Sequence, residues 1–131
     1  MIHTRALAIL ETMWGGNGQA PGVFRINPDN FTGRRLYWFL GHEDLWVTNA
    51  CRELVENARL HGTPDPAWLT YNLRRMTYAL LLVCGRVAQR TFAECGYRPK
   101  CRIIEMPHPA ARVWTRADLD HWQKLIQTGA H

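Results

Sequence analysis

The hydrophobic pattern along the chain alternates short apolar runs with amphipathic stretches, as expected for a sheet covered by helices. The apolar and β-branched stretch LWVTN (45–49) predicts a buried strand. The run ALLLVC (79–84) is apolar on both faces, as central parallel strands are, and CRIIEM (101–106) predicts a further strand. Amphipathic segments follow each of these runs, so strand and helix alternate from about residue 45 onward.

Capping residues mark two of the predicted helices. The stretch RRLYWFLG (34–41) predicts a short helix that ends at Gly41. Asp65 as the N-cap and Pro66 at the first helical position predict a second helix. One face of this second helix carries Trp68, Leu69, Leu73 and Met76.

The C-terminal part predicts two more helices. GRVAQRTFAECG (85–96) predicts a helix that ends at Gly96. Thr115, with Asp118 three residues later, resembles a capping box that opens a last helix, which we expect to stop at Gly129. The inward-facing residues of this last helix are Leu119, Trp122, Leu125 and Ile126.

The N-terminal part allows two interpretations. Residues 3–13 carry apolar side chains at helical spacing, and the glycine-rich stretch GGNGQAPG (15–22) then ends any regular element. A short strand that runs into this stretch fits equally well. For the whole chain we predict an α/β fold in a single domain (1–131), with three layers, α/β/α, around a small, mostly parallel four-stranded sheet.

Composition narrows the class of partner. The 131 residues contain 16 Lys and Arg against 11 Asp and Glu, a formal charge of +5, and the basic residues are mainly arginine. Arginine suits phosphates and base edges, so nucleic acid is one expected partner, although a basic protein without such a partner has the same composition. The four cysteines form no C-x-x-C pair, no apolar stretch approaches membrane-spanning length, and we expect no signal segment. We therefore expect reduced thiols, no metal, and a soluble cytoplasmic protein that does not contact membranes.

Polar residues follow the predicted strands, where ligands bind in parallel α/β folds. Asn49 ends LWVTN, and Arg86 comes shortly after LLLVC. His108 follows CRIIEM and stands between Pro107 and Pro109. Because proline fixes its own φ and restricts the residue before it, the sequence predicts a stiff loop that aims the His108 imidazole.

Five segments occur in an order and at a spacing that resemble the uracil-DNA glycosylase superfamily, most closely its branches with a G-E-A-P-G motif. The resemblance covers roughly residues 15–127. The segments are GQAPG (18–22), NFTGRRL (30–36), WVTNA (46–50), VCGRVAQRTF (83–92) and PHPAAR (107–112).

The resemblance implies a role for several residues. His108 would donate a hydrogen bond to the departing base, and Gln19 would position the attacking water. The Asn49 amide would bind the pyrimidine edge, and Phe31 would stack on the flipped base. The turn beside the base and sugar would be formed by Gly18, Ala20, Pro21 and Gly22.

Three arginines would contact DNA: Arg112, Arg34 and Arg86. Structural alternatives stay open for some residues, since Asn49 can cap a turn, Phe31 can belong to the core, and Arg112 can be a solvated charge. An unrelated α/β protein with a structural HPA loop is a further alternative, which predicts no salt-dependent DNA binding.

The sequence departs from the family pattern at Gln19, where the similar branches have a carboxylate. A neutral amide can orient water but cannot offset a cationic sugar. Asn27, in RINPD, is a second candidate for positioning the water. No cysteine precedes Cys51, so we expect no iron-sulfur cluster and no other cofactor.

Two functions follow from the resemblance. The first is a monomeric DNA glycosylase, a hydrolase of N-glycosyl bonds that flips and excises uracil or another altered pyrimidine during base-excision repair. The alternative is a protein of this fold that binds a modified base, a nucleotide or DNA without excision.

Overall fold

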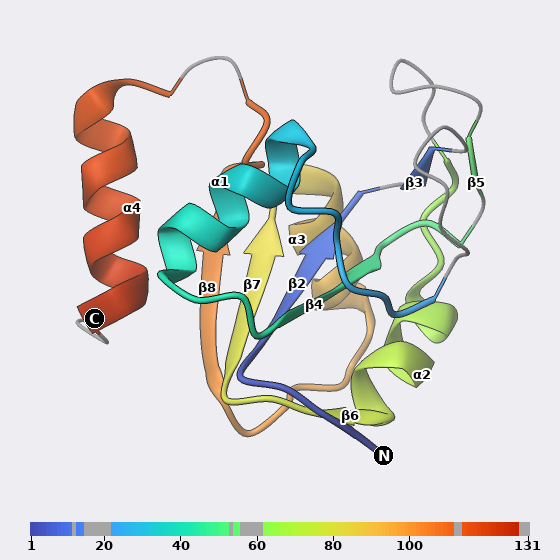
Figure 1. The fold of residues 1–131 in the computed structure, drawn as a ribbon. Helices are drawn as coiled ribbons and strands as arrows, with labels where there is room; N and C mark the ends of the chain where they lie inside the picture. Colours follow the sequence, from blue (N-terminus) through green and yellow to red (C-terminus); the bar gives the residue numbers. More distant parts are fainter. Residues whose placement is uncertain (12, 15–21, 53, 56–61, 112–113, 129–131) are drawn as a thin grey trace.

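The computed structural model describes residues 1–11, 13–14, 22–52, 54–55, 62–111 and 114–128. A parallel sheet of four strands lies at its centre, in the spatial order β4-β2-β7-β8 (Figure 1). These strands are β2 (Ala6–Leu10), β4 (Leu45–Asn49), β7 (Leu80–Cys84) and β8 (Arg102–Met106). The predicted α/β fold with a small parallel sheet is therefore confirmed, and the three strands expected from residue 45 onward lie within a residue of their predicted positions.

The N-terminal ambiguity is resolved in favour of a strand. All five residues of β2 are buried, and the strand lies between β4 and β7. Its side chains alternate between the two faces, with Ala6, Ala8 and Leu10 in one core cluster and Leu7 and Ile9 in the other. The helical interpretation of residues 3–13 is wrong, because a surface helix would bury one stripe only, whereas a central strand buries both faces.

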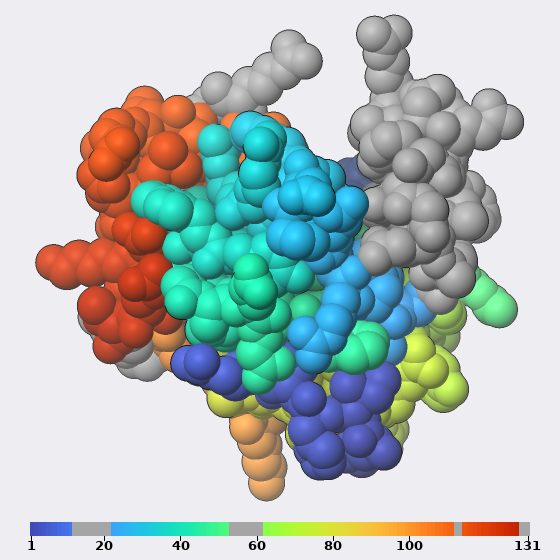
Figure 2. All heavy atoms as spheres, viewed as in Figure 1, coloured from blue at the N-terminus to red at the C-terminus, as the bar shows by residue number. Residues whose placement is uncertain are grey.

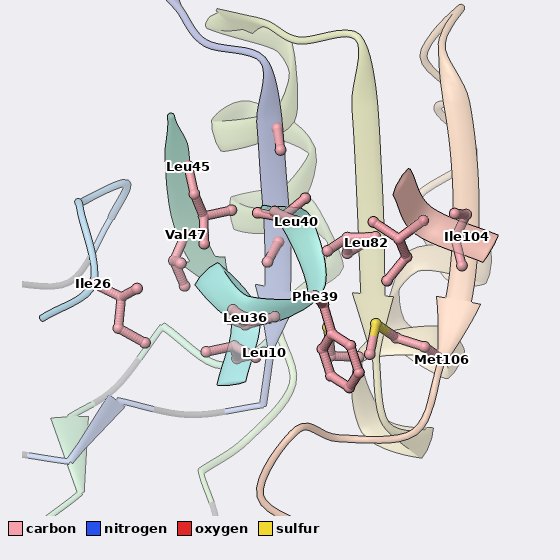
Figure 3. Close-up of a cluster of buried hydrophobic side chains, with 14 residues drawn as sticks. Leu10, Ile26, Leu36, Phe39, Leu40, Leu45, Val47, Leu82, Ile104 and Met106 are labelled. Atoms are coloured by element: carbon pink, nitrogen blue, oxygen red, sulfur yellow. The ribbon is translucent and has the colours of Figure 1, made fainter. Parts of the chain in front are cut away.

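Helices cover both faces of the sheet. The helices are α1 (Phe31–Leu40), α2 (Pro66–Arg74), α3 (Arg86–Glu94) and α4 (Arg116–Thr128). Leu36 and Phe39 of α1 pack in one core cluster with Leu10 of the sheet (Figure 3). Ile126 of α4 and Ala8 of β2 belong to the same cluster. Leu69 of α2 and Phe92 of α3 pack with Ile9 on the opposite face. The fold therefore has three layers, with one hydrophobic cluster between the sheet and the helices on each of its faces.

Helix α1 begins three residues earlier than predicted. The Asn30 side chain caps it by accepting a hydrogen bond from the Gly33 backbone N–H, at 2.6 Å. Gly33 suits this position because a Cβ there would lie 2.1 Å from the Asn27 carbonyl oxygen. The helix ends as expected at Gly41, which has a φ of 75°.

The other caps largely follow the sequence. Asp65 accepts from the Trp68 backbone N–H at 3.0 Å, and helix α2 starts at Pro66. Met76 does not share the face of this helix, because the helix ends at Arg74 and Met76 lies in a following short strand.

Helices α3 and α4 also keep their predicted starts. Helix α3 ends at Glu94, before Gly96, whose φ is 65°. Thr115 and Asp118 form the predicted capping box, each side chain accepting from the other's backbone N–H at 3.1 Å. Gly129 lies outside the described residues. Ile126 is buried, and Leu119, Trp122 and Leu125 pack against the same core cluster as predicted.

Two pairs of very short parallel strands complete the fold. They are β1 (Ile2–His3) with β6 (Met76–Thr77), and β3 (Met13–Trp14) with β5 (Leu54–Val55). None of the four cysteines, which all lie in the described ranges, forms a disulfide bond. No helix in the described ranges has the length and apolar character needed to cross a membrane.

Candidate active site

The carboxyl ends of the four central strands lie at one edge of the sheet, because all four strands are parallel. Asn49 is the last residue of β4, and Glu11 follows β2 directly. Gly85 follows β7, and His108 comes two residues after β8. The strand order therefore gives the sequence Asn49, Glu11, Gly85 and His108 along this edge. Such edges are where parallel α/β folds bind ligands.

The His108 ring is oriented by its own loop. The Ala110 backbone N–H donates to His108 Nδ1 at 3.0 Å. The His108 carbonyl oxygen accepts from the Ala111 backbone N–H at 2.9 Å and from Trp114 Nε1 at 3.0 Å. Because Nδ1 is an acceptor, the neutral ring carries its proton on Nε2. The loop thus presents an Nε2–H donor, which the two prolines alone did not predict.

Neighbouring segments hold this loop in place. Arg35 Nη1 of α1 donates to the carbonyl oxygen of Pro109, which is buried, at 3.0 Å. A Cβ on Gly85 would lie 3.4 Å from His108 Cβ, so the turn after β7 closes against the histidine. Gly85 has a φ of 89°, a conformation that side-chain-bearing residues rarely adopt. A residue with a side chain would therefore strain the turn beside His108.

The electrostatic environment keeps His108 neutral near pH 7. Burial lowers the pKa of His108, and the negative charge of Glu11 raises it by a smaller amount. The pKa thus remains below the ordinary value for histidine. At neutral pH the imidazole is therefore uncharged and can donate from Nε2.

Glu11 is a site residue that the sequence interpretation missed. It is partly buried, and its backbone carbonyl oxygen accepts from the Cys51 N–H at 2.9 Å, beside Asn49 in the sheet. Glu11 lies at the same edge of the sheet as His108, and the negative charge of its carboxylate raises the pKa of that histidine. The signal was present in the sequence, because a carboxylate directly follows the apolar run ALAIL (6–10). It was overlooked because that run was not assigned to a strand.

Asn49 is a buried polar residue at the end of β4. The residue is 2% exposed, and its Nδ2 has no hydrogen-bond partner among the residues that the structure describes. In the parallel register Asn49 is opposite Leu10, which places both side chains on the sheet face that α1 covers. An unsatisfied buried donor costs about 1–3 kcal/mol, and a ligand that accepts from it would recover this loss.

Phe31 is not part of the core. It is the first residue of α1 and is 49% exposed, so the alternative of a core residue is wrong. The Arg35 guanidinium lies 4.5 Å from the centroid of its ring. Phe31 is therefore available to a ligand on the α1 side of the molecule.

The glycine-rich motif is described only at its end. Gly22 is buried, and its carbonyl oxygen accepts from the Thr48 hydroxyl of β4 at 2.9 Å. Its φ of 127° suits glycine. This places the end of the motif beside β4. The predicted residues Gly18, Gln19, Ala20 and Pro21 lie outside the described residues, as does Arg112.

The remaining candidates lie on the surface. Arg34 is exposed on α1, and Arg86 is exposed at the first position of α3, beside the edge of the sheet. The Asn27 side chain is exposed and accepts from the Asp29 backbone N–H at 2.8 Å. This bond forms a local turn, which gives Asn27 a structural role in the loop before α1.

Comparisons of the chain with protein-family models and with curated proteins gave no match. Within the described ranges, no three His, Cys, Asp or Glu side chains are grouped so that they could hold a metal ion. The candidate site consequently rests on its own geometry and on the motifs quoted above.

The low pKa of His108 predicts a stability that depends on pH. As the pH falls below about 6.5, the unfolded chain protonates this histidine more readily than the folded protein does. The free energy of unfolding should therefore decrease with falling pH, by at most about 1.4 kcal/mol per pH unit for one proton. Urea unfolding at several pH values between 7.5 and 5 measures this change.

His108→Asn provides the matched comparison, because an asparagine oxygen can accept the same N–H two residues later without titrating. The pKa of His42 is also lowered by burial, so only the difference between wild type and variant reports on His108. Equal pH dependence in the two proteins would contradict the prediction.

Proposed function

We propose that this protein is a DNA glycosylase that excises uracil or another altered pyrimidine. The observation that carries the proposal is the hydrogen bond from the Ala110 N–H to His108 Nδ1, which leaves Nε2–H as a donor at the carboxyl edge of the sheet. A donor held in advance at this edge suits a reaction in which negative charge develops on a leaving group.

The reaction would proceed on a base flipped out of the DNA, since a stacked base is out of reach. The bond between the sugar C1′ and the base N1 breaks, and its electron pair goes to the base. His108 Nε2–H donates to the pyrimidine carbonyl oxygen beside this bond and stabilises the anion. The oxygen of a water molecule bonds to C1′ and loses a proton, which gives an abasic site and a free base.

Asn49 would recognise the base. Its Nδ2–H, which has no partner among the described residues, can donate to a pyrimidine carbonyl oxygen, and its Oδ1 can accept from the ring N–H. Uracil and related bases present both groups on one edge. A base that satisfies this buried amide binds more tightly. A base that offers a donor in place of the carbonyl leaves the Nδ2–H unpaired and binds more weakly.

Glu11 would supply the negative charge that Gln19 lacks. The developing sugar cation is stabilised by a nearby carboxylate, and Glu11 lies between Asn49 and His108 in the order of the strand ends. The same carboxylate can accept the proton of the attacking water. Glu11 would thus take the role that the carboxylate beside the glycine-rich motif has in the similar branches.

The test is an excision assay with the wild-type protein under single-turnover conditions. Oligonucleotides carry one uracil, a mismatched thymine, or a hypermodified pyrimidine, in single- and double-stranded form. Released base is measured by mass spectrometry and abasic sites by alkaline cleavage. We expect release from at least one substrate and none from the matched unmodified strand.

Binding without excision is the second function to consider, because Gln19 is an amide where similar proteins have a carboxylate. In that case the altered strand would bind more tightly than the unmodified one, yet no base would be released. If no altered strand releases its base and none binds more tightly than the unmodified strand, both functions are refuted.

A further inference from the structure

A cavity lies between α1 and α4, outside the row of strand ends. Its volume is about 370 Å³, and it is lined by Phe31, Arg34, Arg35, Trp38, Arg116 and Leu119. Figure 2 shows α1 and α4 next to each other on this face of the molecule. We call these six residues the arginine groove.

The charge of the arginine groove favours an anion. Three of its lining residues are arginines, and none is acidic. Arg116 pairs with Asp120 at 3.3 Å, but both side chains are exposed, so this pair is weak. Within the described part of the chain, the Arg34 guanidinium has no ion-pair partner. A phosphate could therefore bind here without breaking a strong interaction.

The aromatic residues of the groove favour a flat ligand beside that anion. Phe31 is 49% exposed and Trp38 is 41% exposed, so both rings are accessible to a ligand. Exposed aromatic rings interleaved with arginines are the usual platform for single-stranded nucleic acid, in which bases stack on rings and phosphates bind guanidinium groups. The arginine groove has both elements.

Hydrogen bonds join the two helices that form the groove. Gln123 Nε2 donates to the Trp38 carbonyl oxygen at 3.2 Å, and Gln127 Nε2 donates to the Phe39 carbonyl oxygen at 3.1 Å. Arg35 both lines the groove and binds the Pro109 carbonyl oxygen in the His108 loop. The groove is thus joined directly to the candidate active site.

We propose that the arginine groove binds a phosphate and an adjoining base of a single DNA strand that continues from the active site. The choice of DNA rests on the proposed function, whereas the phosphate and base chemistry rests on the groove itself. Binding here would hold the strand while a base is presented to His108.

The test uses a fluorescent single-stranded oligonucleotide with unmodified bases only, so that it requires no excision. Fluorescence anisotropy measures its Kd for the full-length protein over a range of salt concentrations. Trp38→Ala should weaken binding by at least about fivefold, through loss of stacking. Arg34→Gln and Arg116→Gln should each lower the slope of log Kd against log salt by about 0.7.

Two control variants lie on the opposite side of the sheet. Tyr71→Ala removes an aromatic residue that is 61% exposed on α2, and Arg90→Gln removes an exposed arginine on α3. Both should bind the oligonucleotide as the wild type does, apart from a small general effect of charge. Thermal unfolding checks that all variants are folded.

The proposal is overturned if all three groove variants bind the oligonucleotide with the affinity and salt slope of the wild type. If a free deoxynucleotide monophosphate displaces the oligonucleotide at a concentration equal to the Kd of the oligonucleotide, the choice of a strand over a free nucleotide is overturned. The proposed function is tested independently of the groove. If excision is absent but the groove variants lose binding, the proposed function fails and the groove proposal stands. If excision occurs but the groove variants bind normally, the groove proposal fails and the proposed function stands.

Discussion

The His108→Ala variant is expected to excise its altered pyrimidine about 10²- to 10³-fold more slowly than the wild type, the usual effect of removing one preorganised donor. The physical reason is that Nε2–H stabilises charge that exists only as the bond to the base breaks. The single-turnover rate at saturating enzyme measures this step, and the Kd for the substrate strand should change little.

His108→Asn separates catalysis from loop structure. Its side-chain oxygen can accept the Ala110 N–H as Nδ1 does, but it removes the donor at Nε2. We expect this variant to be as slow as His108→Ala and close to the wild type in stability. His121→Ala, on the exposed surface of α4, is the matched control and should be fully active. A His108→Asn variant with the wild-type rate would show that the imidazole has no part in catalysis.

The Glu11→Gln variant is expected to lose about 10²-fold in single-turnover rate, at the lower end of the range for a positioned acid or base. The substitution keeps the size of the side chain and removes its charge. The sugar cation then has no carboxylate beside it, and the attacking water has no proton acceptor. The rate should be measured at several pH values on the best substrate.

A second readout identifies the role of Glu11 independently of the rate. Because the carboxylate raises the pKa of His108, Glu11→Gln should lower that pKa further, which an NMR titration of the ring nitrogens detects. Glu105→Gln, exposed on β8, serves as the control and should change neither property. A normal rate combined with a lowered His108 pKa would limit Glu11 to an electrostatic neighbour without a catalytic role.

Local patterns predicted the strands and helix starts from residue 45 onward. LWVTN (45–49) and LLLVC (80–84) became strands because their residue types suit a sheet buried on both faces. Asp65 and Thr115 became caps because their oxygens satisfy backbone N–H groups three residues away. Such interactions involve residues close in sequence, so the sequence displays them directly.

The candidate site was predicted only in part. Asn49 and His108 were identified from motifs, but the orientation of the His108 ring depends on the Ala110 N–H, and the unsatisfied Asn49 amide depends on packing. Glu11 was missed because ALAIL (6–10) has a pattern compatible with both helix and strand. The arginine groove joins α1 and α4, helices far apart in sequence, so no local motif could reveal it.

The sequence by itself determined which segments from residue 45 onward are strands or helices, where most helices start, and that a histidine stands on a stiff loop after a strand. Only the tertiary structure decided that β2 is central, that Glu11 acts on His108, and that Phe31 faces the arginine groove. The physical reason is the range of the interactions. Caps and periodicity depend on neighbours within one or two turns, whereas strand order, burial and charge proximity depend on which distant segments pack together.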